Sequence, residues 1–371
     1  MRRLKGWGLF FCLFPLLISI PCLCLSGTKD RRPNEKNFSD YFKKEKEIII
    51  RTTGLDVSYF WQFLVDRQAH LLALDPKGCQ LLLFDDEGHF LRKIGRQGQG
   101  PGEFNLPLTM CLDPAGRIHV EDSRMRRINT FSADGSFLKS FVFSAMHTQA
   151  IALRVDSAGN YYLAAMTIPE EPKGRADWLV KYDDQGKYSR SFYKDLSGRG
   201  WVFRMDPAFT FDIYGDNLYA MQINRYQVDL FNSDGQWLKT LCKPPEYFIP
   251  PDGAYILDER KYDSQKKLYD ELIRLSKSWT RIMRLEIVND RTILIMSAAN
   301  GLVKACNQPY IIDLWTLNGE LIASGIPAEY KFLCSDKKGY AYFLIQSDED
   351  MATEKDPTYI IGRYKFILQK K

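Results

Sequence analysis

The fold of this chain is decided by the stretch Gly95–Phe141, which reads GRQGQGPGEFNLPLTMCLDPAGRIHVEDSRMRRINTFSADGSFLKSF. A glycine-rich loop is followed by four short apolar runs, with turn residues between them. The runs are Pro107–Leu112, Arg117–Glu121, Arg127–Phe131 and Ser136–Phe141. Short β-rich runs broken by Gly, Asp and Pro indicate hairpins rather than helices. Four strands in about 45 residues are typical of one blade of a β-propeller.

Residues at fixed positions in this stretch resemble the NHL-type propeller repeat of secreted bacterial six-bladed propeller proteins. They are GQGPGEF at 98–104, Pro107, Asp113, Gly116, Val120, Asp122, Arg127, Ile128 and Phe131. The resemblance implies the fold but no single activity, because that family holds scaffolds, sensors and unrelated enzymes. It also implies a structural pair, Asp122 with Arg127, that bridges the second and third strands. Asp75/Gln80 and Gln222/Gln227 occupy the corresponding positions elsewhere, which we interpret as divergence of the repeats.

Two kinds of turn recur along the chain and give the number of blades. In the first kind, an aromatic residue precedes a glycine by four positions and an apolar residue follows it by two. This pattern occurs at Phe84/Gly88/Phe90, Phe131/Gly135/Phe137, Tyr182/Gly186/Tyr188, Phe231/Gly235/Trp237 and Trp315/Gly319/Leu321. Glycine suits tight hairpins because they place a residue at positive φ. We expect these turns to join the third and outer strands of five blades.

The second kind of turn is expected to join the first and second strands of six blades. Its members are Asp113–Gly116, Asp156–Gly159, Asp336–Gly339 and the looser Asp66–His70, Tyr214–Asn217 and Asn289–Arg291. One blade therefore lacks an outer strand, and Glu47–Thr53 (EIIIRTT) is predicted to supply it by pairing with Tyr359–Leu368. Such closure leaves the ring without an open blade. The predicted fold is an all-β, six-bladed propeller over residues 47–371.

The N-terminal segment predicts export. Residues 1–26 combine a basic start with the uncharged apolar run Leu9–Leu25, and residues 27–46 read as a polar linker. The location is then periplasmic, cell-surface or secreted. Cys22 and Cys24 leave lipid anchoring open as an alternative to a cleaved signal peptide. The membrane is expected to be contacted only through this leader or its lipid anchor.

Charge and cysteine content exclude some functions. The net charge is +5, of which Arg2, Arg3 and Lys5 contribute +3, so about +2 remains for the folded part. We therefore expect no nucleic-acid binding. Cys79, Cys111, Cys242, Cys306 and Cys334 show no Cys-x-x-Cys spacing, which argues against a zinc knuckle. Cys111 and Cys334 lie on apolar runs, so we do not expect them to pair. A single disulfide among the other three cysteines is an alternative that the sequence does not decide.

One end of the propeller is predicted to carry the working surface. Successive turns of a four-stranded blade alternate between its two ends, so all compact turns share one face. The enlarged connections share the other, including a helical insertion at about 244–283 between blades four and five. Its apolar positions are Leu268, Leu272, Leu275, Trp279 and Ile282. We predict a ligand or partner site on this loop-rich face, at Gln97, Gln99, Glu170, Glu171, Trp201, Phe203 and Trp279.

The sequence favours binding over catalysis. Related propeller lyases hold a metal with several channel histidines, whereas His70, His89 and His119 fall at turns of the other face or inside a strand. Only His147 lies in a blade-to-blade connection. We therefore expect no cofactor and a non-catalytic scaffold for a protein, peptide or glycan. The alternative is a divalent-metal-dependent lyase or lactonase-like hydrolase with Ca²⁺ in the central channel, as in lactonase-like propellers.

Overall fold

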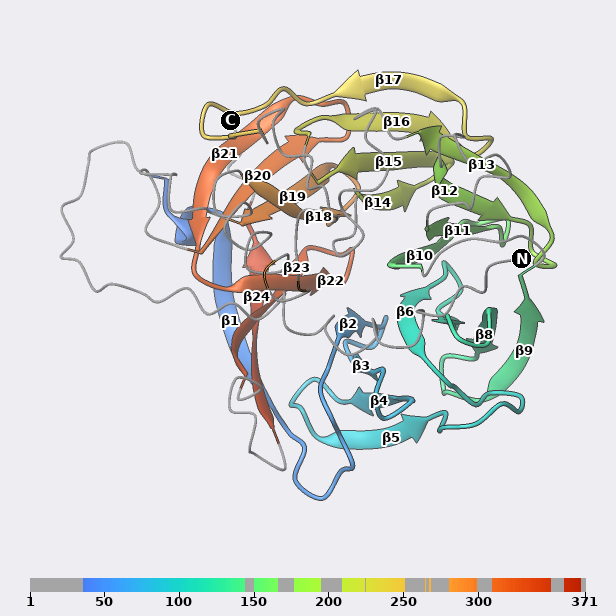
Figure 1. Ribbon diagram of the computed structural model, residues 1–371. Helices are drawn as coiled ribbons and strands as arrows, with labels where there is room; N and C mark the ends of the chain where they lie inside the picture. The colour runs from blue at the N-terminus through green and yellow to red at the C-terminus, as the bar shows by residue number, and fades with distance from the viewer. Residues whose placement is uncertain are drawn as a thin grey trace.

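Six four-stranded antiparallel sheets are arranged around a common axis (Figure 1). This computed structural model describes residues 36–143, 150–165, 177–194, 209–223, 225–250, 264, 267, 280–298, 309–347 and 357–367. Blade one contains β2 (Gln62–Val65), β3 (Leu71–Asp75), β4 (Gln80–Phe84) and β5 (Phe90–Ile94). Blade two contains β6 (Pro107–Leu112), β7 (Ile118–Asp122), β8 (Arg127–Phe131) and β9 (Phe137–Val142). The four predicted strands of Gly95–Phe141 are therefore confirmed to within one residue.

The next three blades repeat this order. Blade three contains β10 (Ala152–Val155), β11 (Tyr161–Ala164), β12 (Asp177–Tyr182) and β13 (Tyr188–Lys194). Blade four contains β14 (Phe209–Tyr214), β15 (Asn217–Gln222), β16 (Val228–Asn232) and β17 (Trp237–Leu241). Blade five contains β18 (Arg281–Ile287), β19 (Thr292–Ala298), β20 (Tyr310–Thr316) and β21 (Leu321–Ala328). Both predicted kinds of turn join the strands assigned to them.

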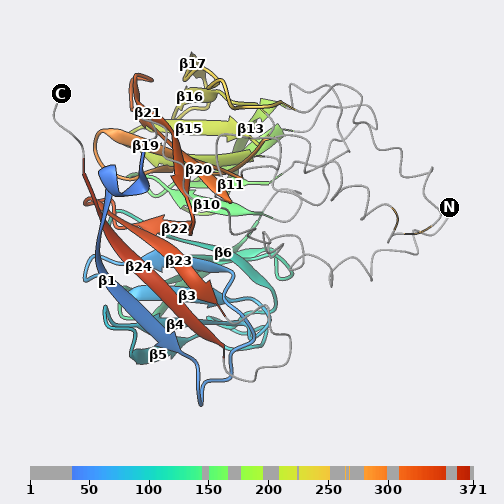
Figure 2. The same cartoon turned by 90° about the vertical axis from the view of Figure 1, so that its left-hand side faces the viewer.

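Blade six is completed by the N-terminal strand, as predicted. Its order is β22 (Lys331–Ser335), β23 (Tyr340–Ser347), β24 (Thr358–Phe366) and β1 (Phe42–Arg51). β1 runs antiparallel to β24, with Ile48 opposite Ile361, and Figure 2 shows the two strands side by side. The two ends of the described chain therefore close the ring.

The predicted polar linker at 27–46 extends too far toward the fold. A short 3₁₀-helix, η3 (Phe38–Asp40), and the first residues of β1 lie within it. The ring of Phe38 stacks on that of Phe42 at 4.7 Å and meets Phe343 edge-on at 5.1 Å. Lys36 Nζ also donates to the carbonyl of Ser324 in β21, at 3.0 Å. Two aromatic side chains thus anchor a segment whose charged neighbours suggested a linker.

Each hairpin glycine between a third and an outer strand also packs against the preceding blade. Gly186 has φ +79°, and a Cβ there would lie 2.0 Å from Cδ2 of Phe141 in β9. Gly88 has φ +93°, and its Cβ would lie 2.4 Å from the carbonyl oxygen of Ile49 in β1. Glycine is therefore required by the turn and by close contact between blades.

Apolar side chains fill the spaces between neighbouring sheets. The cluster between blades one and two, for example, includes Leu74 and Ile118, both fully or almost fully buried. Burial of each such side chain contributes about 1.5–3 kcal/mol. Equivalent clusters occupy the other five spaces among the described residues, so the core is a ring of wedges between the blades.

Most of the predicted helical insertion lies outside the described residues, including Leu268, Leu272, Leu275 and Trp279. Its C-terminal boundary was wrong, because Ile282 belongs to β18 and is 1% exposed. The helix-like spacing of apolar residues continues from the insertion into β18. A buried strand also carries apolar residues at these positions, so the spacing alone did not mark the boundary. Within the described ranges, no helix is long and apolar enough to cross a membrane.

Candidate functional site

The predicted partner site on the loop-rich face is only partly within the described chain. Gln97 and Gln99 lie in the glycine loop between β5 and β6, where Gln97 bridges to Phe104. The other five predicted residues, Glu170, Glu171, Trp201, Phe203 and Trp279, lie outside the described residues. The flanking strands show that their connections leave from and return to the same end of the propeller as the glycine loop.

The glycine loop is anchored by Asp122 and Arg127, which face each other across β7 and β8. Arg127 donates to the carbonyl oxygens of Gln99 at 2.9 Å, Gly100 at 2.9 Å and Glu103 at 2.6 Å. Asp122 accepts the backbone N–H groups that lead into β6, those of Asn105 and Leu106, at 2.8 and 3.0 Å. Both side chains therefore bind backbone groups in and after the glycine loop. Among the described contacts, they form no ion pair with each other.

Arg127→Lys is expected to lower the free energy of unfolding by about 1–3 kcal/mol, because one ammonium cannot serve three carbonyls in a fork geometry. Amide exchange of residues 96–104 should accelerate in the same variant. Lys93→Met, at an exposed position of the neighbouring β5, is the control and should change neither quantity. Unchanged exchange in 96–104 for Arg127→Lys would show that the loop is held by other groups.

Blade one has Gln80 in place of the arginine, in line with divergence of the repeats, yet Asp75 and Gln80 still hold backbone. Gln80 Nε2 donates to Asp75 at 3.1 Å and also to the carbonyl of Asp56. Asp75 accepts the backbone N–H of Ser58 at 3.0 Å. A Gln amide provides donors without a charge, so it holds the incoming backbone as Arg127 does.

A layer of side chains that sequence reasoning missed lies around the axis. The innermost strand of each blade contributes the residue two positions before the one that opens the compact turn, and the opening residues are Asp66, Asp113, Asp156, Tyr214, Val288 and Asp336. In chain order the layer is Leu64, Cys111, Arg154, Asp212, Glu286 and Cys334. Blades three, four and five thus place three charged groups in consecutive positions. Alignment of the six inner strands on their compact turns would have revealed this row.

Asp212 is the centre of the axial charges. Arg154 Nε donates to its Oδ1 at 2.6 Å, and Lys337 Nζ, from the turn between β22 and β23, donates to its Oδ2 at 2.6 Å. The same Oδ2 accepts the backbone N–H of Ile287 in blade five at 2.9 Å. The Asp212 side chain is 2% exposed. One carboxylate therefore connects the inner strands of blades three, four and five with the β22–β23 turn of blade six.

Glu286 makes a second connection, between blades five and six. Arg284 Nε donates to its Oε2 at 2.8 Å. The backbone N–H and the hydroxyl of Ser335 both donate to its Oε1 at 2.7 Å. Lys337 Nζ lies 3.7 Å from the same oxygen. We call Arg154, Asp212, Arg284, Glu286 and Lys337 the axial charge cluster.

Asp212, Glu286 and Arg154 have pKa values that keep them charged at neutral pH. Burial alone raises the pKa of Asp212, but Lys337 and Arg154 outweigh it and hold that pKa below its ordinary value. For Glu286 burial is likewise outweighed, chiefly by Arg284 and Lys337, so its pKa is lowered. Burial opposes the charge of Arg154, yet Asp212 raises its pKa. Opposite charges nearby therefore outweigh burial for these three groups.

The cysteines near the axis are neutral. Burial raises the pKa of the thiols of Cys111 and Cys334, which flank the charged groups. Cys79 and Cys242 are free as well, and Cys306 lies outside the described residues. No disulfide joins the described cysteines, so the pairing left open by the sequence is not made between Cys79 and Cys242.

Three of the four histidines lie in the described chain, and each has a local partner. His70 and His89 close compact turns, with Nδ1 at 2.9 Å from Asp66 and 3.0 Å from Asp85. His119 is 1% exposed within blade two, where its Nε2 lies 3.1 Å from Asp113. His147 lies outside the described residues.

His119 should make stability depend on pH below neutrality. Burial lowers its pKa, although the contact with Asp113 opposes this, while Arg117 and Lys139 add to the lowering. The folded protein therefore binds this proton less readily than the unfolded chain. The resulting stability is present above the unfolded pKa of about 6.5 and is lost as pH falls, by at most about 1.4 kcal/mol per pH unit.

Urea unfolding between pH 7.5 and 5.5 tests this dependence. His119→Gln should lose less stability over that range than the unmodified protein. His89→Gln, which changes a side chain 77% exposed, should follow the unmodified protein. An equal slope for His119→Gln and the unmodified protein would assign the dependence to other groups.

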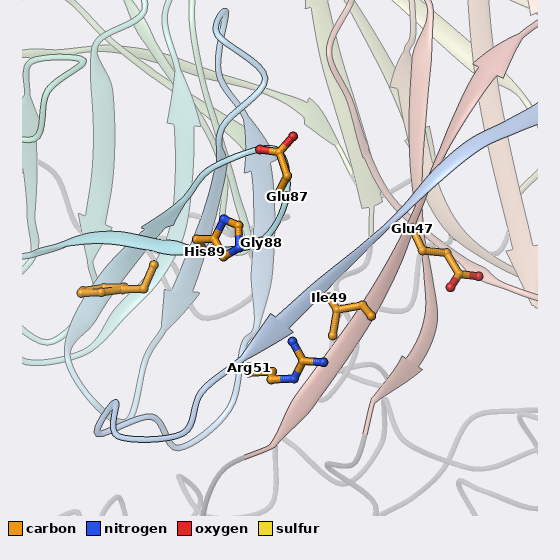
Figure 3. Close-up of a pocket in the computed structure, with 7 residues that line it drawn as sticks. Glu47, Ile49, Arg51, Glu87, Gly88 and His89 are labelled. Carbon is orange, nitrogen blue, oxygen red and sulfur yellow. The ribbon is translucent and has the colours of Figure 1, made fainter.

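An open recess of about 390 Å³ lies where the ring closes. Figure 3 shows Glu47, Ile49 and Arg51 of β1 on one side and Glu87 and His89 of the β4–β5 turn on the other. Asp85, Glu87 and His89 bring ligand atoms within 4.8 Å of one another. However, Asp85 accepts the backbone N–H groups of Glu87 and His89, at 3.0 and 2.8 Å. This triad is explained by the geometry of the turn.

Comparisons with known proteins agree with the fold. Human NHL repeat-containing protein 3 is 27% identical over 33% of this chain and 33% of its own length. The human E3 ubiquitin-protein ligase TRIM32 is 25% identical over 37% of this chain and 22% of its own length. The chain thus spans at most a third of the length of these curated relatives.

Two solved structures from Bacteroides have the same fold. A Bacteroides fragilis protein, for which export has been suggested, gives a TM-score of 0.58 at 14% identity, covering 91% of this chain and 98% of its own. A Bacteroides vulgatus member of the DUF4221 family gives 0.57 at 11% identity, covering 88% and 98%. The family model DUF5128, described as 6-bladed beta-propeller, matches residues 63–296. The chain therefore belongs to this family of six-bladed β-propellers and carries NHL-type repeats.

Proposed function

We propose that this protein is an exported, non-catalytic binding scaffold that holds a protein partner on its loop-rich face. The unequal ends of the propeller carry this proposal. At one end, compact turns such as Asp113–Gly116 close each described hairpin that turns there. At the other, β11 and β12 are separated by 165–176, β13 and β14 by 195–208, and β17 and β18 by 242–280. Long connections on a rigid scaffold are where binding residues concentrate.

The state of the axial acids supports binding rather than channel chemistry. A lyase or lactonase-like hydrolase needs several carboxylates or histidines free to hold a divalent ion. Asp212 and Glu286 instead accept hydrogen bonds from arginine, lysine and backbone groups. A divalent-metal enzyme is the second candidate, with Ca²⁺ ligands at the loop-rich end of the channel.

Export rests on the sequence of the leader and on one solved relative. Residues 1–26 have the basic start and apolar run of a secretory signal. The Bacteroides fragilis protein with the same fold has itself been suggested to be exported. Both observations support a location outside the cytoplasm for the propeller.

Site-specific photo-crosslinking in the native host tests the proposal. A photoreactive residue at Trp201 or Trp279 should give one discrete protein adduct. The matched controls are Gln68 and Gln185, in compact turns of the opposite face, and they should give none. Equal adducts from both faces would contradict the proposed surface. Stoichiometric Ca²⁺ or Zn²⁺ in the purified protein, with turnover lost on chelation, would favour the enzyme instead.

A further inference from the structure

The axial charge cluster has more positive than negative charge. Arg154, Arg284 and Lys337 are the cations, and Asp212 and Glu286 are the anions, so three minus two leaves one positive charge. The flanking thiols of Cys111 and Cys334 stay protonated and do not offset it. A partly buried excess charge is costly unless a counter-charge approaches it.

Both arginines keep a donor nitrogen that none of the described residues accepts from. Arg154 donates through Nε to Asp212 and through Nη1 to the carbonyl of Leu153. Arg284 donates through Nε and Nη2, both to Glu286. Among the described residues, Nη2 of Arg154 and Nη1 of Arg284 therefore have no hydrogen-bond partner. The arginine side chains are 17% and 23% exposed, so neither is fully enclosed by the protein.

The two guanidinium groups are held in place before any ligand arrives. Arg154 lies over the ring of Phe211 at 5.8 Å, and Arg284 lies over that of Phe332 at 5.6 Å. Lys337 comes from the turn at the opposite end from the glycine loop, and its side chain is 49% exposed. Lys337 thus links the two arginines, because it shares Asp212 with Arg154 and lies 3.7 Å from Glu286, which accepts from Arg284.

We propose that the axial charge cluster binds a small oxyanion, a phosphate or a carboxylate, at the compact-turn end of the channel. The planar guanidinium matches the oxygen spacing of both groups, and an ammonium adds a further charge-assisted contact. The site lies at the opposite end from the proposed partner face. If this site binds no oxyanion, the proposed scaffold function is unaffected. If the scaffold proposal fails, the oxyanion proposal is unaffected.

Thermal unfolding of the full chain gives the first test, with inorganic phosphate, acetate and chloride compared at equal ionic strength. A bound oxyanion stabilises the folded state in a saturable manner. We expect a concentration-dependent rise in Tm with phosphate or acetate beyond that with chloride. The anion that gives the larger rise in Tm shows whether the site prefers a phosphate or a carboxylate group. Equal rises for all three anions would overturn the proposal.

Two variants of one turn provide matched controls. Lys337→Gln removes an axial cation and should weaken the oxyanion about tenfold or more. Lys338→Gln makes the same change next to it, where Nζ donates to the carbonyl of Arg67 and not to the cluster. It should bind as the unmodified protein does. Equal losses in both variants would indicate general screening and overturn the proposal.

A spectroscopic measurement keeps the proposal testable if Lys337→Gln does not fold. The ¹⁵N side-chain signals of Arg154 and Arg284 should shift on titration of the unmodified protein with phosphate. The Arg92 signal, from a side chain that donates to the carbonyl of Asp134 on the outer rim, should stay constant. Shifts confined to Arg92, or shared equally by all three, would contradict an axial site.

Discussion

Asp212→Ala is expected to lower the free energy of unfolding by about 3–5 kcal/mol. The substitution leaves Arg154 and Lys337 without their shared carboxylate and removes the acceptor for the Ile287 N–H. Uncompensated buried charge is costly because the low-dielectric surroundings do not screen it. Urea unfolding of the purified variant measures the loss.

A surface ion pair provides the matched control for that result. Asp290 lies 3.9 Å from Arg291 in the compact turn of blade five, and its side chain is 70% exposed. Asp290→Ala should change stability by at most about 1 kcal/mol, because exposed pairs are screened by water and salt. Equal effects at both positions would show that the axial charge cluster does not connect the blades.

Gly88→Ala should destabilise the protein more than Gly116→Ala, by about 1–3 kcal/mol. Both glycines have positive φ, +93° and +84°, so each substitution carries the cost of a left-handed residue, about 1–2 kcal/mol. A Cβ at Gly116 meets nothing within 4 Å, whereas one at Gly88 lies 2.4 Å from the Ile49 backbone oxygen. The difference between the two variants therefore measures the contact with the closing strand.

Thermal unfolding of the two variants side by side gives that difference directly. Gly88→Ala must displace β1 from its place beside blade one, because the nearest atom is backbone and cannot rotate away. Equal losses of stability would mean that β1 is not seated against this turn.

The fold was predictable from the sequence because its turns repeat. Gly88 and its four equivalents mark the outer hairpins, and the missing sixth hairpin indicated that Glu47–Thr53 closes the ring. The start of β1 at Phe42 was not found, because lysines and glutamates conceal two aromatic anchors. Ile282 was misplaced because its apolar spacing fits a helix as well as a buried strand.

The candidate site was less predictable, since its geometry depends on contacts between blades. Arg154, Asp212 and Glu286 are separated by more than fifty residues from one to the next, and only the ring brings them together. Lys337 reaches the cluster from a turn that the sequence marked as merely compact. The glycine loop, in contrast, was found from its local motif, although the backbone role of Arg127 required the structure.

Hydrogen exchange of the closing strand tests the central claim most directly. In a ring closed between β1 and β24, the amides of Phe42–Arg51 and Thr358–Phe366 should exchange together, at the rate of global unfolding. Fast exchange throughout Phe42–Arg51, with Thr358–Phe366 still protected, would contradict closure by the N-terminal strand and the account of the fold that depends on it.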